Sequence, residues 1–236
     1  KSSLADINIG VPQGSVLGPI LFIIYINDLV RAAPMFNFIL FADDTNIFST
    51  DPLLLKSNLI YIEKWCLSNR LILNFTKTFQ ILFKTPNKTV PYPEDYILEM
   101  GNTELVSMPS TKFLGIVLDD AINFKCHISE LCQKLNFALL LLHCARPILD
   151  EKTIVNLYYP FFQPHLIYGI EFYGHTANCH LKLIYLLQTS ALRIILESPP
   201  RDRFTTNFKE LKIMPIEMLY KYRFLIHFHK MNVNGD

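Results

Sequence analysis

FILFADDTNIF, residues 38–48, places two adjacent aspartates, Asp43 and Asp44, between two short apolar runs. Apolar residues on both sides of a polar pair predict two short strands, and aspartate is a common turn residue. The stretch therefore predicts a tight hairpin that carries both carboxylates at its turn.

The two carboxylates stand in an otherwise apolar segment, and no Lys or Arg lies between Arg31 and Lys56. Burying two anions costs several kcal/mol unless a cation neutralises them. A divalent metal would do so, since Mg²⁺ prefers carboxylate oxygens. The alternative is an ordinary hairpin turn whose aspartates are solvated.

The preceding stretch, GVPQGSVLGPILFIIYINDL at residues 10–29, has turn formers followed by an apolar run. Ser15 is expected to cap a helix that runs to about Leu29. Because this helix is apolar on nearly all sides, we expect it to be buried.

Periodicity after the hairpin predicts one helix and several strands. Asp51-Pro52 is a helix start, and apolar residues at 55, 59, 62 and 66 mark one helix face. A strand is expected at 77–84 with Phe79, Ile81 and Phe83 buried, and another strand at 112–119. A hairpin is expected to turn at Gly101-Asn102.

After about residue 122 helical spacing dominates. It is found in two series, Ile128, Leu131, Leu135, Ala138 and Leu142, and then Leu183, Leu186, Leu187, Ala191 and Ile194. The pattern predicts an α+β fold: an antiparallel sheet with helices over residues 1–122, followed by a mostly helical region over residues 123–236.

The composition fits a folded chain, because 50% of its 236 residues are hydrophobic and only 18% are charged. The start at Lys1 leads us to expect a fragment.

Residues 1–122 carry 9 Lys and Arg against 12 Asp and Glu, a net charge of −3, whereas residues 123–236 carry 13 against 9, a net charge of +4. The basic half is expected either to contact a phosphate backbone or to be a solvated face.

The five cysteines form no CxxC pair, which favours reduced thiols inside the cell, in the nucleus, the cytoplasm or both. Cys126, His127 and Cys132 lack zinc-ligand spacing, so we expect them to be structural or incidental. The long uncharged stretches contain prolines and polar residues, so no membrane segment is expected.

The motifs at 10–29 and 38–48 together resemble two consecutive motifs of non-LTR (LINE-type, jockey-like) retrotransposon reverse transcriptases. The 30 residues from Gln13 to Asp43 fit that family. Three further segments resemble it in the same order: LILNFTKTFQILF (71–83), KFLGIVLDDAINFKCHI (112–128) and IVNLYYPFFQPHLIYGIEFYG (154–174). The resemblance implies the later part of a polymerase palm, residues 1–122, followed by a thumb or connection region, residues 123–236.

The resemblance also implies roles for single residues. Asp43 and Asp44 match the catalytic, metal-binding turn, and Lys77 is a candidate for the lysine that assists pyrophosphate departure. Residues expected to lie against nucleic acid or substrate are Gln13, Gly14, Phe41, Ala42, Phe113, Leu114 and Gly115.

The implied activity is RNA-directed DNA synthesis, in which two metal ions, Mg²⁺ or Mn²⁺, assist nucleotidyl transfer onto a primer 3′-hydroxyl. The implied partners are an RNA template, a DNA primer and dNTPs, with no protein partner indicated. One departure matters: the family has a further Asp on a strand before the Gln13-Gly14 loop, and nothing in residues 1–10 matches that segment. Asp6 is expected to be an exposed turn residue, and the chain alone is expected to be inactive.

Two alternatives stay open. An RNA-dependent RNA polymerase also ends a palm hairpin in paired aspartates, but the PQGSVLGP run at residues 12–19 argues against it. A degenerate or co-opted element remnant would serve only as a nucleic-acid-binding or interaction module, and the intact pair Asp43-Asp44 disfavours it.

Overall fold

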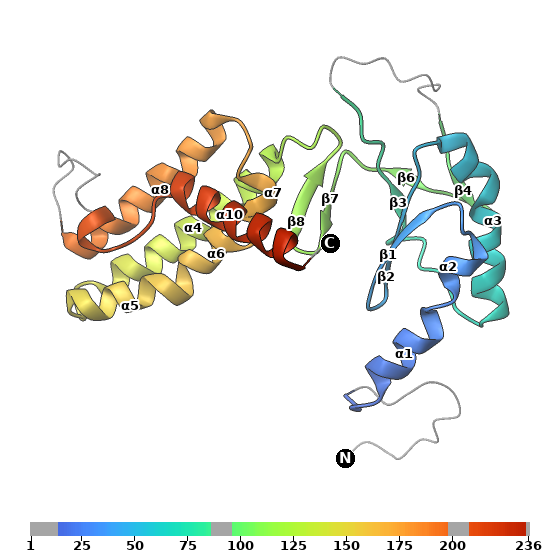
Figure 1. The fold of residues 1–236 in the computed structure, drawn as a ribbon, viewed down its shortest axis with the longest axis horizontal. Coiled ribbons are helices and arrows are strands. Elements are labelled where there is room, and N and C mark those ends of the chain that lie inside the picture. The colour runs from blue at the N-terminus through green and yellow to red at the C-terminus, as the bar shows by residue number, and fades with distance from the viewer. Residues whose placement is uncertain (1–13, 86–95, 198–207, 235–236) are drawn as a thin grey trace. The chain divides into compact units, whose positions relative to one another are not determined.

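The computed structural model describes residues 14–85, 96–197 and 208–234 (Figure 1). Gln13 and Asp6 lie outside the described residues. The chain divides into two compact units: unit 1 holds residues 1–80 and 91–107, and unit 2 holds residues 81–90 and 108–236. These units reflect packing alone, so the division between palm and thumb after residue 122 stays a prediction.

Unit 1 mixes helices with short strands. Its elements in chain order are α1 (Gly18–Ile26), α2 (Leu29–Ala32), β1 (Asn37–Phe41), β2 (Asp44–Phe48), α3 (Pro52–Ser68), β3 (Phe79–Gln80), β4 (Glu99–Met100), β5 (Thr103–Glu104) and β6 (Val106–Ser107). The strand pairs β1–β2 and β4–β5 are antiparallel, and β3–β6 is parallel. The strands pair two by two rather than as one sheet.

Helix α3 forms where the sequence predicts it. The Asp51 carboxylate accepts hydrogen bonds from the backbone N–H groups of Leu53 (2.9 Å) and Leu54 (3.3 Å), and a proline occupies the first turn. Leu59, Ile62 and Cys66 form its buried face. They pack with residues of α2, β4 and the adjoining loops in the core of unit 1.

Two predictions for unit 1 are wrong in detail. The N-cap of α1 is Leu17 rather than the predicted Ser15, although the Ser15 Oγ accepts from the Gly18 N–H at 3.0 Å. Helix α1 ends at Ile26 instead of near Leu29, and Ile23 and Ile24 are 60% and 68% exposed rather than buried. The strand expected at 77–84 is only β3, two residues long, with Phe79 exposed. Apolar composition predicted burial, but in both segments too few described residues pack against the apolar side chains.

Unit 2 is mostly helical. Its elements are β7 (Ser110–Phe113), β8 (Ile116–Asp119), α4 (Lys125–Ala145), α5 (Glu151–Phe161), α6 (Gln163–Ile167), α7 (Ile170–Tyr173), α8 (Asn178–Leu196) and α10 (Ile216–Asn234). Strands β7 and β8 are antiparallel. The predicted fold class, α+β with an antiparallel sheet followed by a mostly helical region, is confirmed, although the described strands form two-stranded sheets and the β3–β6 pair is parallel.

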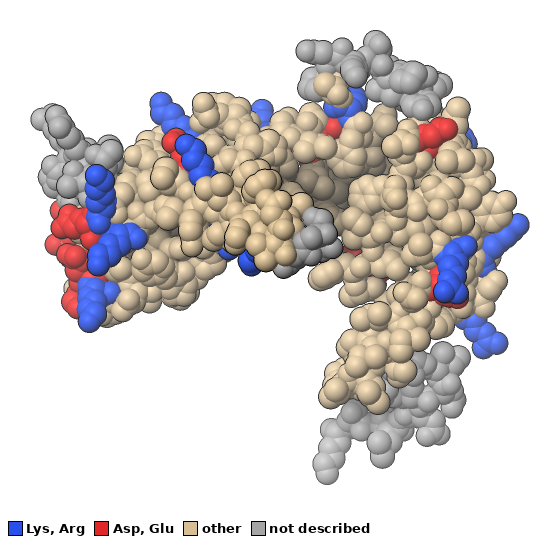
Figure 2. All heavy atoms as spheres, viewed as in Figure 1, with Lys and Arg blue, Asp and Glu red and all other residues tan. Residues whose placement is uncertain are grey.

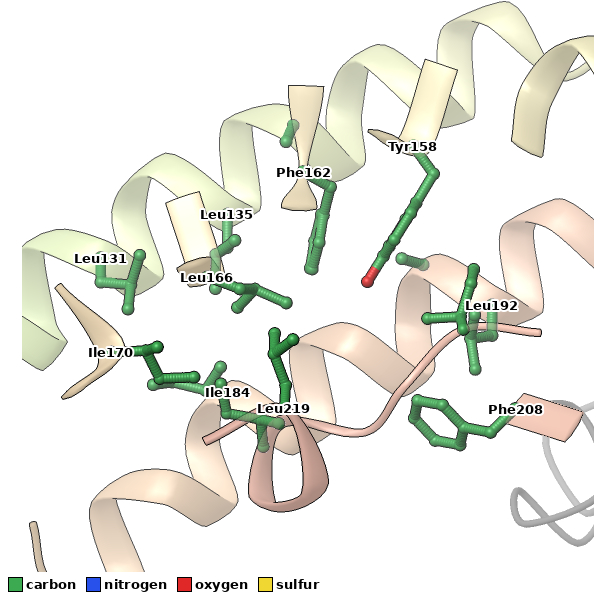
Figure 3. Close-up of a cluster of buried hydrophobic side chains, with 14 of the residues drawn as sticks. Leu131, Leu135, Tyr158, Phe162, Leu166, Ile170, Ile184, Leu192, Phe208 and Leu219 are labelled. Atoms are coloured by element: carbon green, nitrogen blue, oxygen red, sulfur yellow. The ribbon is translucent and has the colours of Figure 1, made fainter. Parts of the chain in front are cut away.

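The core of unit 2 lies between its helices. Figure 3 shows Leu131 and Leu135 of α4 facing Leu166 and Ile184, with Tyr158 and Phe162 beside them. The α4 periodicity is confirmed, because all five apolar positions of the predicted series, from Ile128 to Leu142, are buried.

The predicted face of α8 is only partly right. Ala191 is buried, and Leu187 and Ile194 pack against the core. Leu183 and Leu186, however, are half exposed, while Ile184, Gln188 and Leu192 are buried instead. The hydrogen bonds of Gln188 determine which face of α8 is buried. Its Nε2 donates to the Tyr158 hydroxyl (3.0 Å) and to the Met214 carbonyl (2.9 Å), and its Oε1 accepts from the Ile216 N–H (2.9 Å). A polar side chain is buried here because each of its groups is hydrogen-bonded.

Helix α8 is also the one described helix that is long and apolar enough to cross a membrane by length and composition. It supplies Ile184, Ala191 and Ile195 to the core of unit 2, and the core helix of a soluble protein passes the same test. The expectation of no membrane segment stays a prediction.

Candidate active site

The β1–β2 hairpin carries the two aspartates. Its pairs run from Asn37 opposite Phe48 to Phe41 opposite Asp44, which leaves Ala42 and Asp43 as a two-residue turn. Ala42 has a φ of +50°, in the left-handed region that the turn of a tight hairpin requires. Asp43 therefore lies at the tip of the hairpin and Asp44 begins β2, as the sequence predicts.

Asp43 and Asp44 are both exposed, which agrees with the alternative of a hairpin turn whose aspartates are solvated. Water solvates both carboxylates, so the pair needs no cation to be stable in this chain. Within the described residues, neither carboxylate has a Lys, Arg or His partner within 4.0 Å. Their oxygens are therefore available to a cation from solution.

The turn supplies only part of a metal-binding set. Among the described residues no three His, Cys, Asp or Glu side chains gather closely enough to hold a metal ion. Two adjacent carboxylates are hard oxygen ligands of the kind that Mg²⁺ accepts, with its other positions taken by water or phosphate. Asp43 and Asp44 thus fit a divalent metal that takes further ligands from elsewhere.

Phe41, Ala42 and Gly14 are exposed residues of unit 1. Phe41 ends β1 with 58% of its side chain exposed, beside the turn. Gly14 has a φ of +83°, and a Cβ placed there would meet nothing within 4 Å. A backbone with open space around it can be approached closely by a base or a sugar.

Lys77 lies in a turn, so the prediction that it belongs to an apolar strand is wrong. Its backbone N–H donates to the Asn74 carbonyl (3.0 Å), and the Asn74 side chain accepts from the Thr76 N–H (3.2 Å). Asparagine-centred turns of this kind compete with strand formation. The Lys77 side chain is exposed, and its role in pyrophosphate departure is not tested by this position.

Phe113, Leu114 and Gly115 belong to a hairpin rather than to the single strand predicted for residues 112–119. Phe113 pairs with Ile116, and the turn residues Leu114 and Gly115 have φ values of +45° and +85°. Positive φ at both positions is what a type I′ hairpin turn needs, and glycine adopts it without strain. The Tyr168 hydroxyl donates to the Leu114 carbonyl and holds the turn.

The structure thus brings the predicted residues together in two groups. Phe41, Ala42, Asp43 and Asp44 share one turn in unit 1, whereas Phe113, Leu114 and Gly115 share another turn in unit 2. Lys77 and Gly14 lie in unit 1 on separate segments. Figure 2 shows that the visible face of each unit consists mainly of side chains that are neither acidic nor basic.

Sequence reasoning missed a pocket in unit 2 whose lining includes Lys112, His127, Lys134, His165 and Tyr168. His127 was expected to be structural or incidental, and its position fits a structural role: it is buried, and its Nδ1 accepts a hydrogen bond from the Val117 N–H at 3.3 Å. One signal was present: His127 precedes Leu131 and Leu135 at steps of four, on the buried face of α4.

Comparison with known proteins gives a family and several relatives. A family model described as reverse transcriptase (RNA-dependent DNA polymerase) matches residues 5–118. The RNA-directed DNA polymerase from mobile element jockey of Drosophila melanogaster is 28% identical over 229 residues, 90% of this chain and 24% of the relative. The probable RNA-directed DNA polymerase from transposon BS of the same species is 29% identical over 227 residues, 88% of this chain and 24% of the relative.

A third relative, the probable RNA-directed DNA polymerase from transposon X-element of D. melanogaster, is 25% identical over 224 residues, which cover 88% of this chain and 24% of the relative. The chain therefore spans about a quarter of the length of the curated relatives that it matches. No solved structure matches it significantly.

Proposed function

We propose that this chain forms part of an RNA-directed DNA polymerase of a non-LTR element, because residues 5–118 match the reverse transcriptase family model and 90% of the chain is similar to the jockey polymerase. The observation that carries the proposal is the β1–β2 hairpin, which lies inside the matched residues and exposes Asp43 and Asp44 at its turn. The two unpaired carboxylates are part of the ligand set that a nucleotidyl-transfer site of this kind needs.

Asp43 and Asp44 would hold the divalent metal, Mg²⁺ or Mn²⁺. When bound, such metal ions activate the primer 3′-hydroxyl and offset negative charge on the leaving pyrophosphate. The exposed oxygens of both residues, with no cationic partner in the described part of the chain, support this assignment. The remaining protein ligand would come from a strand that precedes the Gln13-Gly14 loop in the family.

The other predicted residues would position the nucleic acid. Gly14, whose backbone is open to approach, and Gln13 would lie against the template and the incoming dNTP. Phe41 and Ala42 adjoin the carboxylates and would lie near the primer end. Lys77 would offset charge on pyrophosphate, since its ammonium group is exposed and free to reach an anion.

The hairpin turn at Phe113, Leu114 and Gly115 would hold the primer backbone. The ligands of the whole protein would be an RNA template, a DNA primer and dNTPs. We also propose an intracellular location, in the nucleus or the cytoplasm, which the five free cysteines support.

The test is primer extension on an RNA template by the longer protein that contains this chain. Asp43→Asn and Asp44→Asn should each lower extension at least ~100-fold, because each removes a negatively charged oxygen ligand. Asp51→Asn is the matched control: it makes the same chemical change in the same unit but keeps the helix cap, since asparagine caps as well as aspartate.

Extension by Asp43→Asn within a few-fold of the unaltered protein would contradict the metal assignment. If the unaltered protein binds a primer–template but never extends it with Mg²⁺ or Mn²⁺, the chain belongs to a remnant that only binds nucleic acid.

A further inference from the structure

The β7–β8 hairpin ends in a turn that its own sequence only half favours. Leu114 and Gly115 form this turn, with φ values of +45° and +85°. Glycine adopts a positive φ without strain, but leucine carries a Cβ that makes the left-handed region unfavourable. The conformation of Leu114 therefore depends on contacts from outside the turn.

One such contact is a hydrogen bond from a distant tyrosine. The Tyr168 hydroxyl donates to the carbonyl of Leu114, 54 residues earlier in the chain. Among the described residues, this hydroxyl is the one group outside the hairpin that hydrogen-bonds to the two turn residues. Because Tyr168 lies between α6 and α7, the bond joins the turn to the helical part of unit 2.

The Tyr168 ring also lies against the second turn residue. A Cβ placed on Gly115 would lie 3.0 Å from Cε1 of Tyr168 and 3.2 Å from its hydroxyl oxygen. A side chain at this position would press against the ring, so glycine allows the turn and the tyrosine to pack together.

The backbone that carries Tyr168 is held in place on both sides. The Tyr168 N–H donates to the Pro164 carbonyl of α6 (3.0 Å), and the following residue, Gly169, has a φ of +69° at the start of α7. A Cβ on Gly169 would lie 2.4 Å from Cδ1 of Ile116, so this backbone packs directly against the first residue of β8. Tyr168 therefore reaches the turn from a fixed support.

The body of the hairpin is anchored separately from its turn. Val117 of β8 is buried, and its N–H donates to Nδ1 of His127 on α4 (3.3 Å). The turn is open to solvent, since Leu114 is 39% exposed and Tyr168 57% exposed. Loss of the Tyr168 hydroxyl should thus alter the turn and leave the body of the hairpin in place.

We infer that Tyr168 is a positioning residue of the polymerase, which acts by fixing the conformation of the Leu114–Gly115 turn. The inference rests on the proposed function, which assigns this turn to the primer. In this reading Tyr168 touches neither primer nor dNTP and acts through the turn. A displacement of about 1 Å at a reacting group can cost up to ~100-fold in rate, so a turn that loses its support should slow nucleotide addition.

The test is single-turnover primer extension by the longer protein that contains this chain. It measures the rate constant of the first nucleotide addition, the fraction of enzyme that reacts and the Kd for the primer–template. Tyr168→Phe removes only the hydroxyl, so the rate constant should fall roughly tenfold while the reacting fraction and the Kd stay within about twofold.

Tyr222→Phe is the matched control. Tyr222 lies on α10 in the same unit with a similar exposed fraction, 52%, and its hydroxyl has no hydrogen bond within the described part of the chain. The same chemical change at this position should alter none of the three quantities.

A second variant tests whether the hydroxyl acts through the turn. Leu114→Asn places asparagine before Gly115, the pair that type I′ turns prefer, so the turn should no longer need the support of Tyr168. In this background Tyr168→Phe should lower the rate constant about twofold or less. Each loss is measured within its own background, so any effect of Leu114→Asn itself cancels.

Three results would overturn the inference. An unchanged rate constant in Tyr168→Phe, or equal losses in the two backgrounds, would show that the hydroxyl does not act through the turn. A smaller reacting fraction at an unchanged rate constant would indicate a purely structural role. Weaker duplex binding at an unchanged rate constant would mean that the hydroxyl contacts the nucleic acid itself.

If the unaltered longer protein does not extend a primer, the proposed function fails and the inference falls with it. The two failures are distinct, because each of the other results requires an unaltered protein that extends the primer.

Discussion

Phe41 and Asp44 face each other as the last pair of the β1–β2 hairpin, so Ala42 and Asp43 alone form its turn. Ala42 has a φ of +50° there, which costs a residue with a Cβ roughly 1–2 kcal/mol and glycine little. The turn that carries Asp43 is therefore held in a conformation that its sequence does not favour.

Ala42→Gly should relieve this strain and raise the free energy of unfolding by up to about 1 kcal/mol. Ala33→Gly is the matched control, because Ala33 is buried with a φ of −143°, so its change should lower stability by about 0.5–1 kcal/mol. Urea unfolding of the chain measures both. A loss of stability in Ala42→Gly would show that this turn is not left-handed at Ala42.

The second prediction concerns Gly169. Its φ is +69°, and an added Cβ would lie 2.4 Å from Cδ1 of Ile116. Strain and overpacking together should make Gly169→Ala lose about 3 kcal/mol. Gly14→Ala is the control, because Gly14 has a similar φ of +83° but no atom within 4 Å. Equal losses of unfolding free energy for the two variants, in thermal or urea unfolding, would show that Ile116 does not pack closely against Gly169.

The third prediction concerns the buried amide of Gln188. Gln188→Leu would leave the Ile216 N–H, the Met214 carbonyl and the Tyr158 hydroxyl without their partner, so we expect a loss of about 3 kcal/mol. Ser190→Ala, on the exposed side of the same helix, should change stability by less than ~0.5 kcal/mol. Denaturant unfolding distinguishes them, and a neutral Gln188→Leu would mean that α8 does not pack on this face.

The fourth prediction is a pH dependence from His127. Its pKa is lowered in the folded chain, chiefly by burial, so the unfolded chain binds a proton more readily. The contribution of the neutral His127 ring to the free energy of unfolding should then be complete above about pH 6.5. The free energy of unfolding should fall as the pH drops below that value. Lys134, Lys112 and Glu130 also act on this ring, and His165 contributes in the same direction.

His127→Gln should flatten that dependence, although the variant is less stable at neutral pH because the Val117 N–H loses its imidazole acceptor. Urea titrations at several pH values between 5 and 8 measure the slope. An unchanged slope in His127→Gln would assign the dependence to other groups.

Local chemistry explains what the sequence predicted correctly. The hairpin turn at Asp43 and the helix cap at Asp51 depend on neighbouring residues only, and both are confirmed. The buried face of α4 was also predicted, because its apolar residues recur on one side without interruption. The turn at Gly101 follows in the same way, with a φ of +61°.

Tertiary contacts explain the features that the sequence did not predict. Helix α8 buries the face that carries Gln188, because groups from α5 and from the start of α10 form hydrogen bonds with the Gln188 amide. The Leu114-Gly115 turn interrupts a strand-like run, although glycine was a usable signal. The pocket at His127 joins β7, α4 and α6, and no local pattern reveals such a meeting.

We propose that Asp43 and Asp44 form one part of a two-metal polymerase site whose further carboxylate precedes the Gln13-Gly14 loop. Two metal ions held about 4 Å apart need more ligands than these two residues supply, and the described residues provide no third acidic, cysteine or histidine ligand beside them. The measurement is primer extension with Mg²⁺ on an RNA template, by the chain alone and by the chain joined to the preceding polymerase segment of the longer protein. We expect extension by the joined protein and none by the chain alone. Robust extension by the chain alone would contradict it and would place the further carboxylate within this sequence, at Asp6, Asp28, Asp119 or Asp120.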